Sequence, residues 1–276
     1  MFQFSEVLLD NKKRETFLYV DNTVSYLNYM RRNLPQIYEM SGFLTTNSNI
    51  TDKREGEQTS YMNSCKGVFT MGHWLRDWLI SQGLSADKVH VVGGGTNVDV
   101  NLIKPLQRTC NKILFIGKDF KRKGGFITYD AFKILRDQGK NTELYVIGPA
   151  KNPIDNPIEG YHFIGQIPFE EEAKYYNMCD VFCMPSYFEA YGLVFVEALT
   201  FGLPCIGRNC YEMPYFIEDG KTGLLLQHDD PRELATLLTR ILNDESFSRT
   251  VAANREKYLK DYSWDSVAAR FFKVIG

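Results

Sequence analysis

Two carboxylates stand eight positions apart in a strongly apolar stretch, PSYFEAYGLVFVEALTFGLP, which runs from residue 185 to residue 204. They are Glu189 and Glu197, and Gly192 lies between them. Acidic side chains are rarely buried unless a partner satisfies them. The stretch itself contains no Lys, Arg or His. Both glutamates therefore need partners from elsewhere in the fold or from a ligand.

The apolar pattern predicts a helix that begins near Tyr191. Its first amides, from Gly192 and Leu193, would lack intrahelical acceptors and would offer an anion the positive end of the helix dipole. Glu197 shares a helix face with Leu193 and would lie about 6 Å further along the axis, at ~1.5 Å per residue. A diphosphate at the helix start would place an adjacent ribose there, within reach of a double acceptor. Glu189 would then meet whatever the diphosphate carries, which favours a nucleotide diphosphate-sugar.

A basic loop precedes these residues in the chain. The segment GKDFKRKGG, residues 117–125, follows an apolar run and carries Lys118, Lys121, Arg122 and Lys123. A loop after a strand of a parallel sheet lies at the carboxyl edge, where such folds bind ligands. Arg122 could hold phosphate oxygens bidentately, with Lys123 as a point charge beside it. Taken alone, this loop is also consistent with a solvated basic turn, and the two-glutamate helix with a cap plus a surface residue.

The second half of the chain alternates predicted strands and helices, which indicates a parallel sheet covered on both faces. One helix is expected to open with Asp230 as its cap, Pro231 in the first turn and Glu233 completing a capping box. The predicted strands cover 111–117, 142–149, 161–168, 180–186, 203–209 and 222–227, and the predicted helices 126–139, 169–179, 193–202 and 229–244.

The first hundred residues are less regular. Residues 65–84 are typical of a strand, a turn and a helix, and 87–95 of another strand. A glycine-rich segment, 93–105, is expected to cross between two domains. The resulting prediction is a partial N-terminal α/β domain with its linker over 1–104 and a Rossmann-like nucleotide-sugar-binding domain over 105–260. Residues 261–276 are expected to form a helix that packs back on the N-terminal part.

Bulk properties exclude several classes. A net charge near −2 argues against a general nucleic-acid or membrane coat. No stretch approaches the roughly 20 apolar residues of a spanning helix, and the N-terminus lacks the pattern of a signal peptide. A cytoplasmic protein is therefore expected. The six cysteines form no C-x-x-C pair and are predicted to be reduced core thiols rather than metal ligands or disulfides.

The segment SYFEAYGLVFVEAL resembles the Glu-x7-Glu motif of retaining GT-B glycosyltransferases, in particular glycosyltransferase family 4, the glycosyl transferases group 1. The resemblance covers residues 65–272 in consistent order. It runs through FIGKDFKRKGG, VIGP, FIGQIPFEEEAKYYNMCDVFCMPS, GLPCIG, EDGKTGLLLQHDDPRELA and YSWDSVAARF. It implies a GT-B fold, with two α/β domains.

The resemblance also implies roles for single residues. Arg122 and Lys123 would bind the donor pyrophosphate and Glu189 would contact the transferred sugar, which makes these three the catalytic candidates. Glu197 would hold the ribose. The other implied donor-binding residues are Lys118, where many relatives have arginine, the backbone around Tyr191, Gly192 and Leu193, and the backbone of Gln166 and Ile167 beside the nucleobase.

The implied activity is transfer of a hexose from a nucleotide diphosphate-sugar to an acceptor hydroxyl with retention of anomeric configuration. The diphosphate would leave and assist deprotonation of the acceptor, so no cofactor and no metal are expected. The base (uridine, guanosine or adenosine) stays open, so UDP, GDP and ADP are all candidates. The acceptor, a glycan, a lipid-linked molecule or a small molecule, stays open too.

The front of the chain departs from the family pattern. The family's opening strands, with their glycine-rich loop and acceptor-side histidine, have no evident counterpart, and His73 is interpreted as structural. The chain thus resembles a truncated or split member, and the alternative is a nucleotide-sugar-binding module, or one subunit of a split transferase, without activity alone. A partner chain that supplies the missing N-terminal half, or a peripheral contact with the inner membrane face, is a further expectation. A glycosidase would not need the basic loop, and GGGTNVD does not match a dehydrogenase fingerprint.

Overall fold

The computed structural model describes residues 2–4, 15–41, 48–105 and 109–276. The chain forms two compact units, one made of Met1–Gly95 with Trp264–Gly276 and the other of Thr96–Ser263. We call them the first unit and the second unit. Their boundaries lie at 95/96 and 263/264, compared with 104/105 and 260/261 in the sequence-based division.

The second unit is built on a six-stranded parallel sheet with the order β7-β6-β5-β8-β9-β10. The chain runs outward from β5 to β7, returns to β8 and then runs outward in the other direction to β10. The sheet therefore has a topological switch point between β5 and β8, where α/β folds of this kind bind ligands at the carboxyl edge. The strands are β5 (Lys112–Ile116), β6 (Glu143–Ile147), β7 (Tyr161–Gly165), β8 (Val181–Cys183), β9 (Cys205–Arg208) and β10 (Gly223–Leu226).

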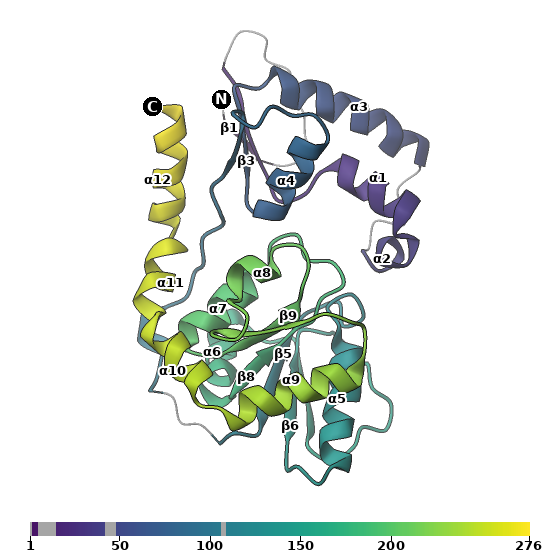
Figure 1. The fold of residues 1–276 in the computed structure, drawn as a ribbon, viewed down its shortest axis with the longest axis vertical. Helices are drawn as coiled ribbons and strands as arrows, with labels where there is room; N and C mark the ends of the chain where they lie inside the picture. Colours follow the sequence, from purple (N-terminus) through teal and green to yellow (C-terminus); the bar gives the residue numbers. More distant parts are fainter. Residues whose placement is uncertain (1, 5–14, 42–47, 106–108) are drawn as a thin grey trace. The chain divides into compact units, whose positions relative to one another are not determined.

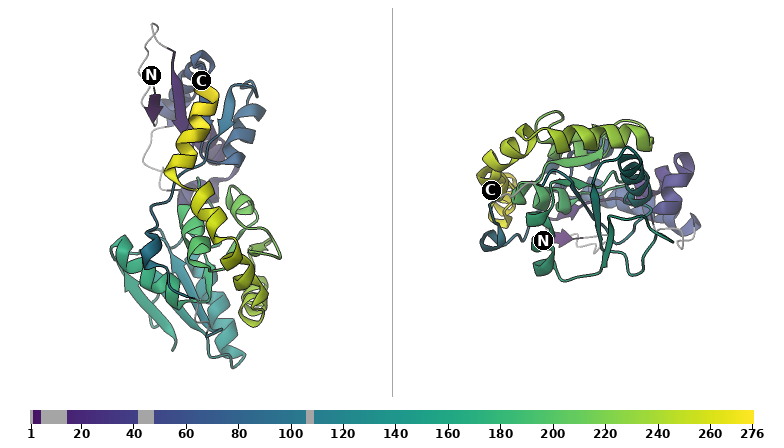
Figure 2. Two further views of the ribbon diagram at one scale, coloured as in Figure 1. Left: turned by 90° about the vertical axis from the view of Figure 1, so that its left-hand side faces the viewer. Right: turned by 90° about the horizontal axis from the view of Figure 1, so that it is seen from below.

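Helices cover both faces of this sheet (Figure 1). Helices α5 (Gly125–Asp137) and α9 (Pro231–Asn243) pack beside each other on one face, and α6 (Phe169–Met178) and α7 (Leu193–Phe201) pack together on the other. Figure 2 shows the same two layers after a quarter turn. The remaining helical segments are η1 (Val100–Leu102), α8 (Met213–Phe216), α10 (Ser246–Ala253) and α11 (Arg255–Asp261).

The core of the second unit follows from its strands. The central strands β5 and β8 are buried almost throughout and consist of continuous apolar runs, as expected when both faces of a parallel sheet are covered. Helix α7 is apolar except at Glu197 and Thr200, and these two residues are buried with most of the helix, so it too lies in the core. All six strands and four helices that the sequence predicted for this half are confirmed, and their ends shift by only a few residues.

The predicted capping box at α9 is wrong in its details. The Asp230 carboxylate accepts a hydrogen bond from the Arg232 amide at 2.9 Å. The Glu233 carboxylate does not return to the Asp230 amide but accepts from the amides of Gln227 at 2.8 Å and His228 at 3.1 Å. The chain approaches the helix in an extended conformation, which brings those two earlier amides over its first turn.

The first unit has its own parallel sheet, in the order β1-β2-β3-β4. The predicted strand, turn and helix over 65–84 and the strand over 87–95 are present as β3, α4 and β4. The earlier elements were not predicted. The largely polar α3 carries almost no periodic apolar pattern, whereas β2 is a continuous apolar run and α1 buries one apolar face, so both had a signal that was overlooked. The elements are β1 (Phe2–Phe4), β2 (Phe17–Val20), α1 (Val24–Asn33), α2 (Pro35–Met40), α3 (Ser48–Ser64), β3 (Gly67–Thr70), α4 (His73–Ser81) and β4 (Val89–Val91).

The last helix, α12 (Trp264–Ile275), also belongs to the first unit. Its residues Phe271, Val274 and Ile275 pack against a buried cluster formed by Phe17, Tyr19, Phe69 and Val92. Phe271 makes edge-to-face contacts with Tyr19 and Phe69, at ring-centroid distances of 5.0 and 4.6 Å. The far end of the chain thus completes the core of the unit that the front of the chain begins.

The six cysteines of the chain differ in burial. Cys65, Cys179, Cys183 and Cys205 are buried, as expected of core thiols, whereas Cys110 is exposed and Cys210 is half-buried. Burial raises the pKa of Cys65 to about 11 and that of Cys183 to about 12.

Among the helices of the described ranges, none is both long enough and apolar enough to span a membrane.

Candidate active site

A pocket of about 430 Å³ opens at the carboxyl edge of the second unit's sheet. Its walls come from the ends of strands and the loops that follow them, and from two helices. These residues are 116–119 and 122–123 at the end of β5 and in the next loop, 147–148 at the end of β6, 166–167 after β7, 169 and 172 in α6, and 194 and 197 in α7. We call it the carboxyl-edge pocket. It lies at the switch point, where the loops after neighbouring strands diverge.

Six of the predicted site residues line this pocket, and four do not. The lining residues are Lys118, Arg122, Lys123, Gln166, Ile167 and Glu197. The remaining four, Glu189, Tyr191, Gly192 and Leu193, lie in the loop before α7 and at its first residue. In the first turn of α7, Val194 rather than Leu193 turns its side chain to the pocket beside Glu197.

The basic loop is partly buried rather than a solvated turn. Arg122 donates from its amide and from Nε to the Asp119 carboxylate, at 3.1 and 3.2 Å, and from Nη1 to the Phe188 carbonyl at 2.7 Å. Its side chain is 20% exposed and that of Lys123 is 15% exposed. Of the four basic side chains in this loop, only those of Lys118 and Lys121 are exposed, as all four would be in a solvated turn.

Glu189 finds its partner 66 positions upstream. The Lys123 ammonium forms a hydrogen-bonded ion pair with the Glu189 carboxylate, whose side chain is only 9% exposed. Buried charges persist when they are paired in good geometry, because an unpaired charge there is costly. The ion pair joins the basic loop directly to the loop that precedes α7.

Backbone contacts hold these two loops together. The amide of Tyr187 and the hydroxyl of Ser186 both donate to the Arg122 carbonyl, at 2.9 and 3.2 Å. Gly124, which caps α5 with a φ of 78°, lies so close that a Cβ there would be 2.4 Å from the Pro185 carbonyl oxygen. The loops after β5 and β8 are therefore one braced structure on the side of the pocket where α5 and α7 begin.

The start of α7 needs glycine. Gly192 is the N-cap with a φ of 100°, a left-handed conformation that side chains other than glycine's adopt at a cost. The side chain of Tyr191 is turned into the core, where its ring packs edge-to-face on Phe216 at 5.0 Å. What this segment offers a ligand is thus its backbone amides, as expected for the free N-terminus of a helix.

Glu197 lies one turn into α7 and is buried. The hydroxyl of Tyr176, on α6, donates to its carboxylate at 3.1 Å. Burial raises the pKa of Glu197, and the Tyr176 hydrogen bond opposes that change. Its protein partner is therefore a tyrosine and not a cation, which leaves further acceptor capacity directed toward the pocket.

Glu172 is a pocket residue that the sequence reasoning missed. It is half-buried on α6, and burial followed by the nearby charge of Glu197 raises its pKa to about 7, with Lys118 opposing the change. The available signal was its position four residues before Tyr176. Residues four apart share a helix face, but in the run EEE nothing in the sequence separates this glutamate from its neighbours.

The positive charges around the pocket come from Lys118, Arg122 and Lys123. Across the described ranges, no group of three or more His, Cys, Asp or Glu side chains is placed to hold a metal ion. The phosphate-binding role of the cations, and the metal-free site, remain predictions.

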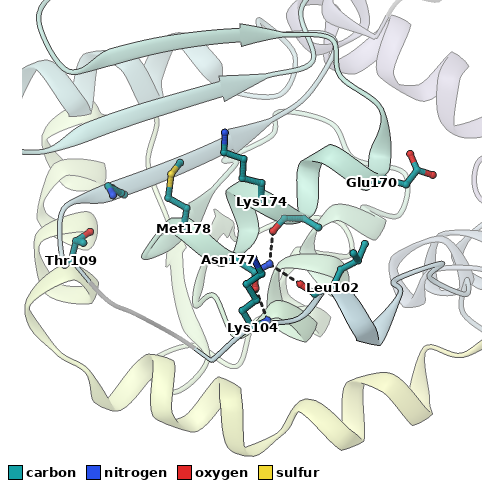
Figure 3. A pocket seen from close by; sticks show the side chains of 9 residues that line it. Leu102, Lys104, Thr109, Glu170, Lys174, Asn177 and Met178 are labelled. Atoms are coloured by element: carbon teal, nitrogen blue, oxygen red, sulfur yellow. Dashed lines mark hydrogen bonds between the residues drawn. The ribbon is translucent and has the colours of Figure 1, made fainter.

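A second pocket, of about 530 Å³, lies at the opposite edge of the sheet, near the start of β5 and the end of α6 (Figure 3). Asn177 lines this pocket. Its side-chain nitrogen donates to the Leu102 carbonyl at 2.8 Å, and its side-chain oxygen accepts from the Lys104 amide at 2.8 Å. These bonds fasten the segment after η1 to α6. Because ligands of such folds bind at the carboxyl edge, we assign this pocket a structural role.

Comparison with known proteins places the site in context. Residues 103–258, which include every residue lining the carboxyl-edge pocket, match the family model described as glycosyl transferases group 1. The chain is 29% identical over 179 residues to a D-inositol 3-phosphate glycosyltransferase of Corynebacterium kroppenstedtii, covering 59% of this chain and 39% of that protein. It is 27% identical over 242 residues to a phosphatidyl-myo-inositol mannosyltransferase of Mycobacterium leprae, covering 83% and 64%. The chain thus spans less than two thirds of either relative.

Among solved structures, the sucrose-phosphate synthase of Thermosynechococcus elongatus superposes with a TM-score of 0.73 at 21% identity, covering 95% of this chain and 67% of that one. This likeness concerns the fold alone. It confirms the predicted α/β fold with Rossmann-like parallel sheets of the GT-B type.

Proposed function

The chain belongs to the glycosyl transferases group 1 family, and from that premise we propose that it transfers a hexose from a nucleotide diphosphate-sugar to an acceptor hydroxyl. One observation carries the proposal. The basic loop after β5, the start of α7 and the carboxylate of Glu197 all meet at one pocket at the switch point of the sheet. A nucleotide diphosphate uses each of these features.

The diphosphate is assigned to the side of the pocket where Arg122 and Lys123 lie beside the loop that leads into α7. Asp119 and the Phe188 carbonyl already orient the Arg122 guanidinium, so little side-chain entropy is lost when phosphate binds. The amides of Gly192 and Leu193 add the positive end of the helix dipole. These groups would stabilise the charge that develops on the leaving diphosphate.

The ribose is assigned to Glu197. Its carboxylate lies about 6 Å along the helix axis from the first free amides, at ~1.5 Å per residue, which matches the step from a phosphate to its ribose. The Tyr176 hydroxyl already donates one hydrogen bond to this carboxylate. The remaining acceptor capacity suits the two hydroxyls of a vicinal diol.

Glu189 is proposed to contact the transferred sugar. In the free protein its carboxylate is held by Lys123, so a phosphate that draws on Lys123 would release an acceptor for a sugar hydroxyl beside the reacting centre. Retention of configuration is proposed with the leaving phosphate taking the acceptor proton. A glycosidase is disfavoured because its chemistry does not call for the basic loop or for the glycine-capped start of α7 beside the two glutamates.

A second candidate is a nucleotide-sugar-binding module or one subunit of a split transferase. The observation that favours it is that every residue of the carboxyl-edge pocket belongs to the second unit. Such a module would bind the nucleotide-sugar donor as tightly as an active transferase would, but it would not transfer the sugar. The acceptor, a partner chain, the cytoplasmic location and contact with the inner membrane face remain predictions.

The test is calorimetric titration of the protein with UDP, GDP and ADP, beside the variant Glu197→Ala. Binding of one nucleotide that the variant weakens at least about tenfold, the effect of one lost charge-assisted hydrogen bond, supports the donor site. The control is Glu171→Ala, on the exposed side of α6. Consumption of the matching sugar nucleotide, with the anomeric configuration of the product read by NMR, then separates an enzyme from a module. Absence of nucleotide binding would overturn the proposal.

A further inference from the structure

Glu172 is the one acidic side chain on α6 that lines the carboxyl-edge pocket. Within the described part of the chain its carboxylate forms no hydrogen bond or ion pair, although it is half-buried. The charges nearest to it are those of Glu197 and Lys118. A half-buried acid without a partner costs stability, so its position facing a pocket points to a ligand that supplies hydrogen-bond donors.

The position of Glu172 matches one part of a nucleotide. Phe169 and Glu172 are three apart in the first turn of α6 and line the pocket together with Gln166 and Ile167. Tyr176, one turn further along the same face, bonds the carboxylate to which the ribose is assigned. A ribose at Glu197 therefore carries its base toward the first turn of α6, between Ile167 and Glu172.

The chemistry of a carboxylate then discriminates among bases. An ionised carboxylate accepts hydrogen bonds and donates none. Guanine presents two adjacent donors, N1–H and the exocyclic amino group, which fit its two oxygens. Uracil presents a single N3–H between two carbonyl oxygens that a carboxylate repels. Adenine sets its amino group beside a ring nitrogen that is itself an acceptor.

Building on the proposed function, we propose that Glu172 selects guanine at the base end of the pocket, so that the donor is a GDP-sugar. The two oxygens of Glu172 accept from N1–H and the amino group, while the backbone of Gln166 and Ile167 borders the ring. Binding supplies the partner that this carboxyl lacks in the free protein.

Binding of guanine should also depend on pH, because only the ionised form is an acceptor at both oxygens. The charges that act on this carboxyl are those of Glu197 and Lys118. Asp119, Arg122 and Lys123 also line the pocket, and Tyr176 lies on the same helix. With a pKa of about 7, the binding-competent fraction rises about tenfold between pH 6 and pH 8, and the affinity rises with it.

The experiment measures the affinities of GDP, IDP, UDP and ADP for the wild type and for Glu172→Gln at pH 8. IDP lacks only the exocyclic amino group, so it tests the contact without any change to the protein. We expect GDP to bind about tenfold more tightly than IDP, UDP or ADP, as for one hydrogen bond to a charged group. Glu172→Gln should lose that preference, whereas Glu171→Gln should keep it. A GDP-hexose, which has no terminal phosphate to titrate, should bind more tightly at pH 8 than at pH 6 in the wild type and in Glu171→Gln, and Glu172→Gln should lose this pH dependence.

The two proposals fail in different ways. If UDP or ADP binds most tightly, or if GDP and IDP bind equally and Glu172→Gln changes nothing, the guanine assignment is wrong while the donor pocket stands. If none of the four nucleotides binds, the proposed function itself fails, and the guanine assignment fails with it.

Discussion

At the scale of single residues, the two glutamates of the apolar stretch satisfy their carboxylates in different ways. Glu189 is neutralised by Lys123, and Glu197 is hydrogen-bonded by Tyr176. The charge of Glu189 is balanced by Lys123 without a ligand, whereas the Glu197 carboxylate can still accept further hydrogen bonds. This difference is why we assign the ribose to Glu197 and a role beside the reacting centre to Glu189.

The buried ion pair predicts a stability effect. Lys123→Met should leave the Glu189 carboxylate buried without a cation and lower the free energy of unfolding by about 3 kcal/mol. The double variant Lys123→Met/Glu189→Gln should recover part of this loss, because no buried charge then lacks a partner. Urea unfolding measures both. Equal stabilities of the single and double variants would show that the pair is not a buried charge pair.

Glu172 predicts a dependence of stability on pH. Its pKa is raised from 4.5 to about 7 in the folded protein, chiefly by burial, so the native state holds a proton that the unfolded state releases. Its contribution therefore favours the native state at low pH and declines as the pH rises from 4.5 to 7. Glu172→Gln should be more stable than the wild type at pH 8, and the difference should vanish near pH 4.

Thermal unfolding at the two pH values measures that difference. The control Glu171→Gln shows how much the loss of one exposed charge from the same helix changes the thermal stability. A Glu172→Gln variant that is less stable than the wild type at pH 8 would contradict the raised pKa.

At the scale of elements, the pocket depends on two loops that approach closely. The loop after β5 ends at Gly124 and the loop after β8 passes Pro185. The two loops are joined by hydrogen bonds from the Tyr187 amide and the Ser186 hydroxyl to the Arg122 carbonyl. Each loop leads into a helix capped by a glycine with positive φ, Gly124 for α5 and Gly192 for α7. The glycines allow both helices to begin where the two loops meet.

The two glycines at the ends of α5 test this arrangement. Gly124 and Gly139 have φ values of 78° and 77°, but a Cβ at Gly139 would meet nothing within 4 Å. Gly139→Ala should cost about 1 kcal/mol for the left-handed conformation alone. Gly124→Ala should cost more and should also weaken nucleotide binding, because the loop must move away from Pro185. Urea unfolding and nucleotide titration check this, and equal costs at the two sites would refute the close approach.

At the scale of the whole molecule, sequence order and spatial grouping differ. Helix α12 ends the chain but completes the core of the first unit, while the second unit is a continuous segment, Thr96–Ser263, that contains every residue of the pocket. We therefore predict that a substitution can lower the stability of the first unit without changing the proposed nucleotide binding by the second unit.

Adjacent phenylalanines of α12 test that separation. Phe271 packs on Tyr19 and Phe69, whereas Phe272 is 69% exposed. Phe271→Ala should lower the stability of the first unit by about 2 kcal/mol, below the range for a fully buried ring because Phe271 is only half-buried, and Phe272→Ala should be nearly neutral. Calorimetric unfolding measures the loss, and nucleotide affinity should be unchanged in both. Equal effects of the two substitutions would show that α12 does not complete this core.

Much of the second unit could be predicted from the sequence. Its strands and helices are encoded by local apolar periodicity, since the period of the side chains matches the geometry of each element. The basic loop and the two glutamates stood out because their residue types conflict with their surroundings. The largely polar α3 of the first unit carries no such signal, and it was missed.

The tertiary structure alone decided which residues meet. Lys123 and Glu189 are 66 positions apart, and Glu172 reaches the same pocket as Glu197 only because α6 and α7 pack on one face of the sheet. Helix α12 joins the first unit by covering a cluster that includes Phe17 and Val92. Such contacts follow from the order of strands in a sheet, which is set by burial over the whole chain and not by any local pattern. The sequence by itself thus determined the elements and the candidate chemistry, and the fold determined the partners.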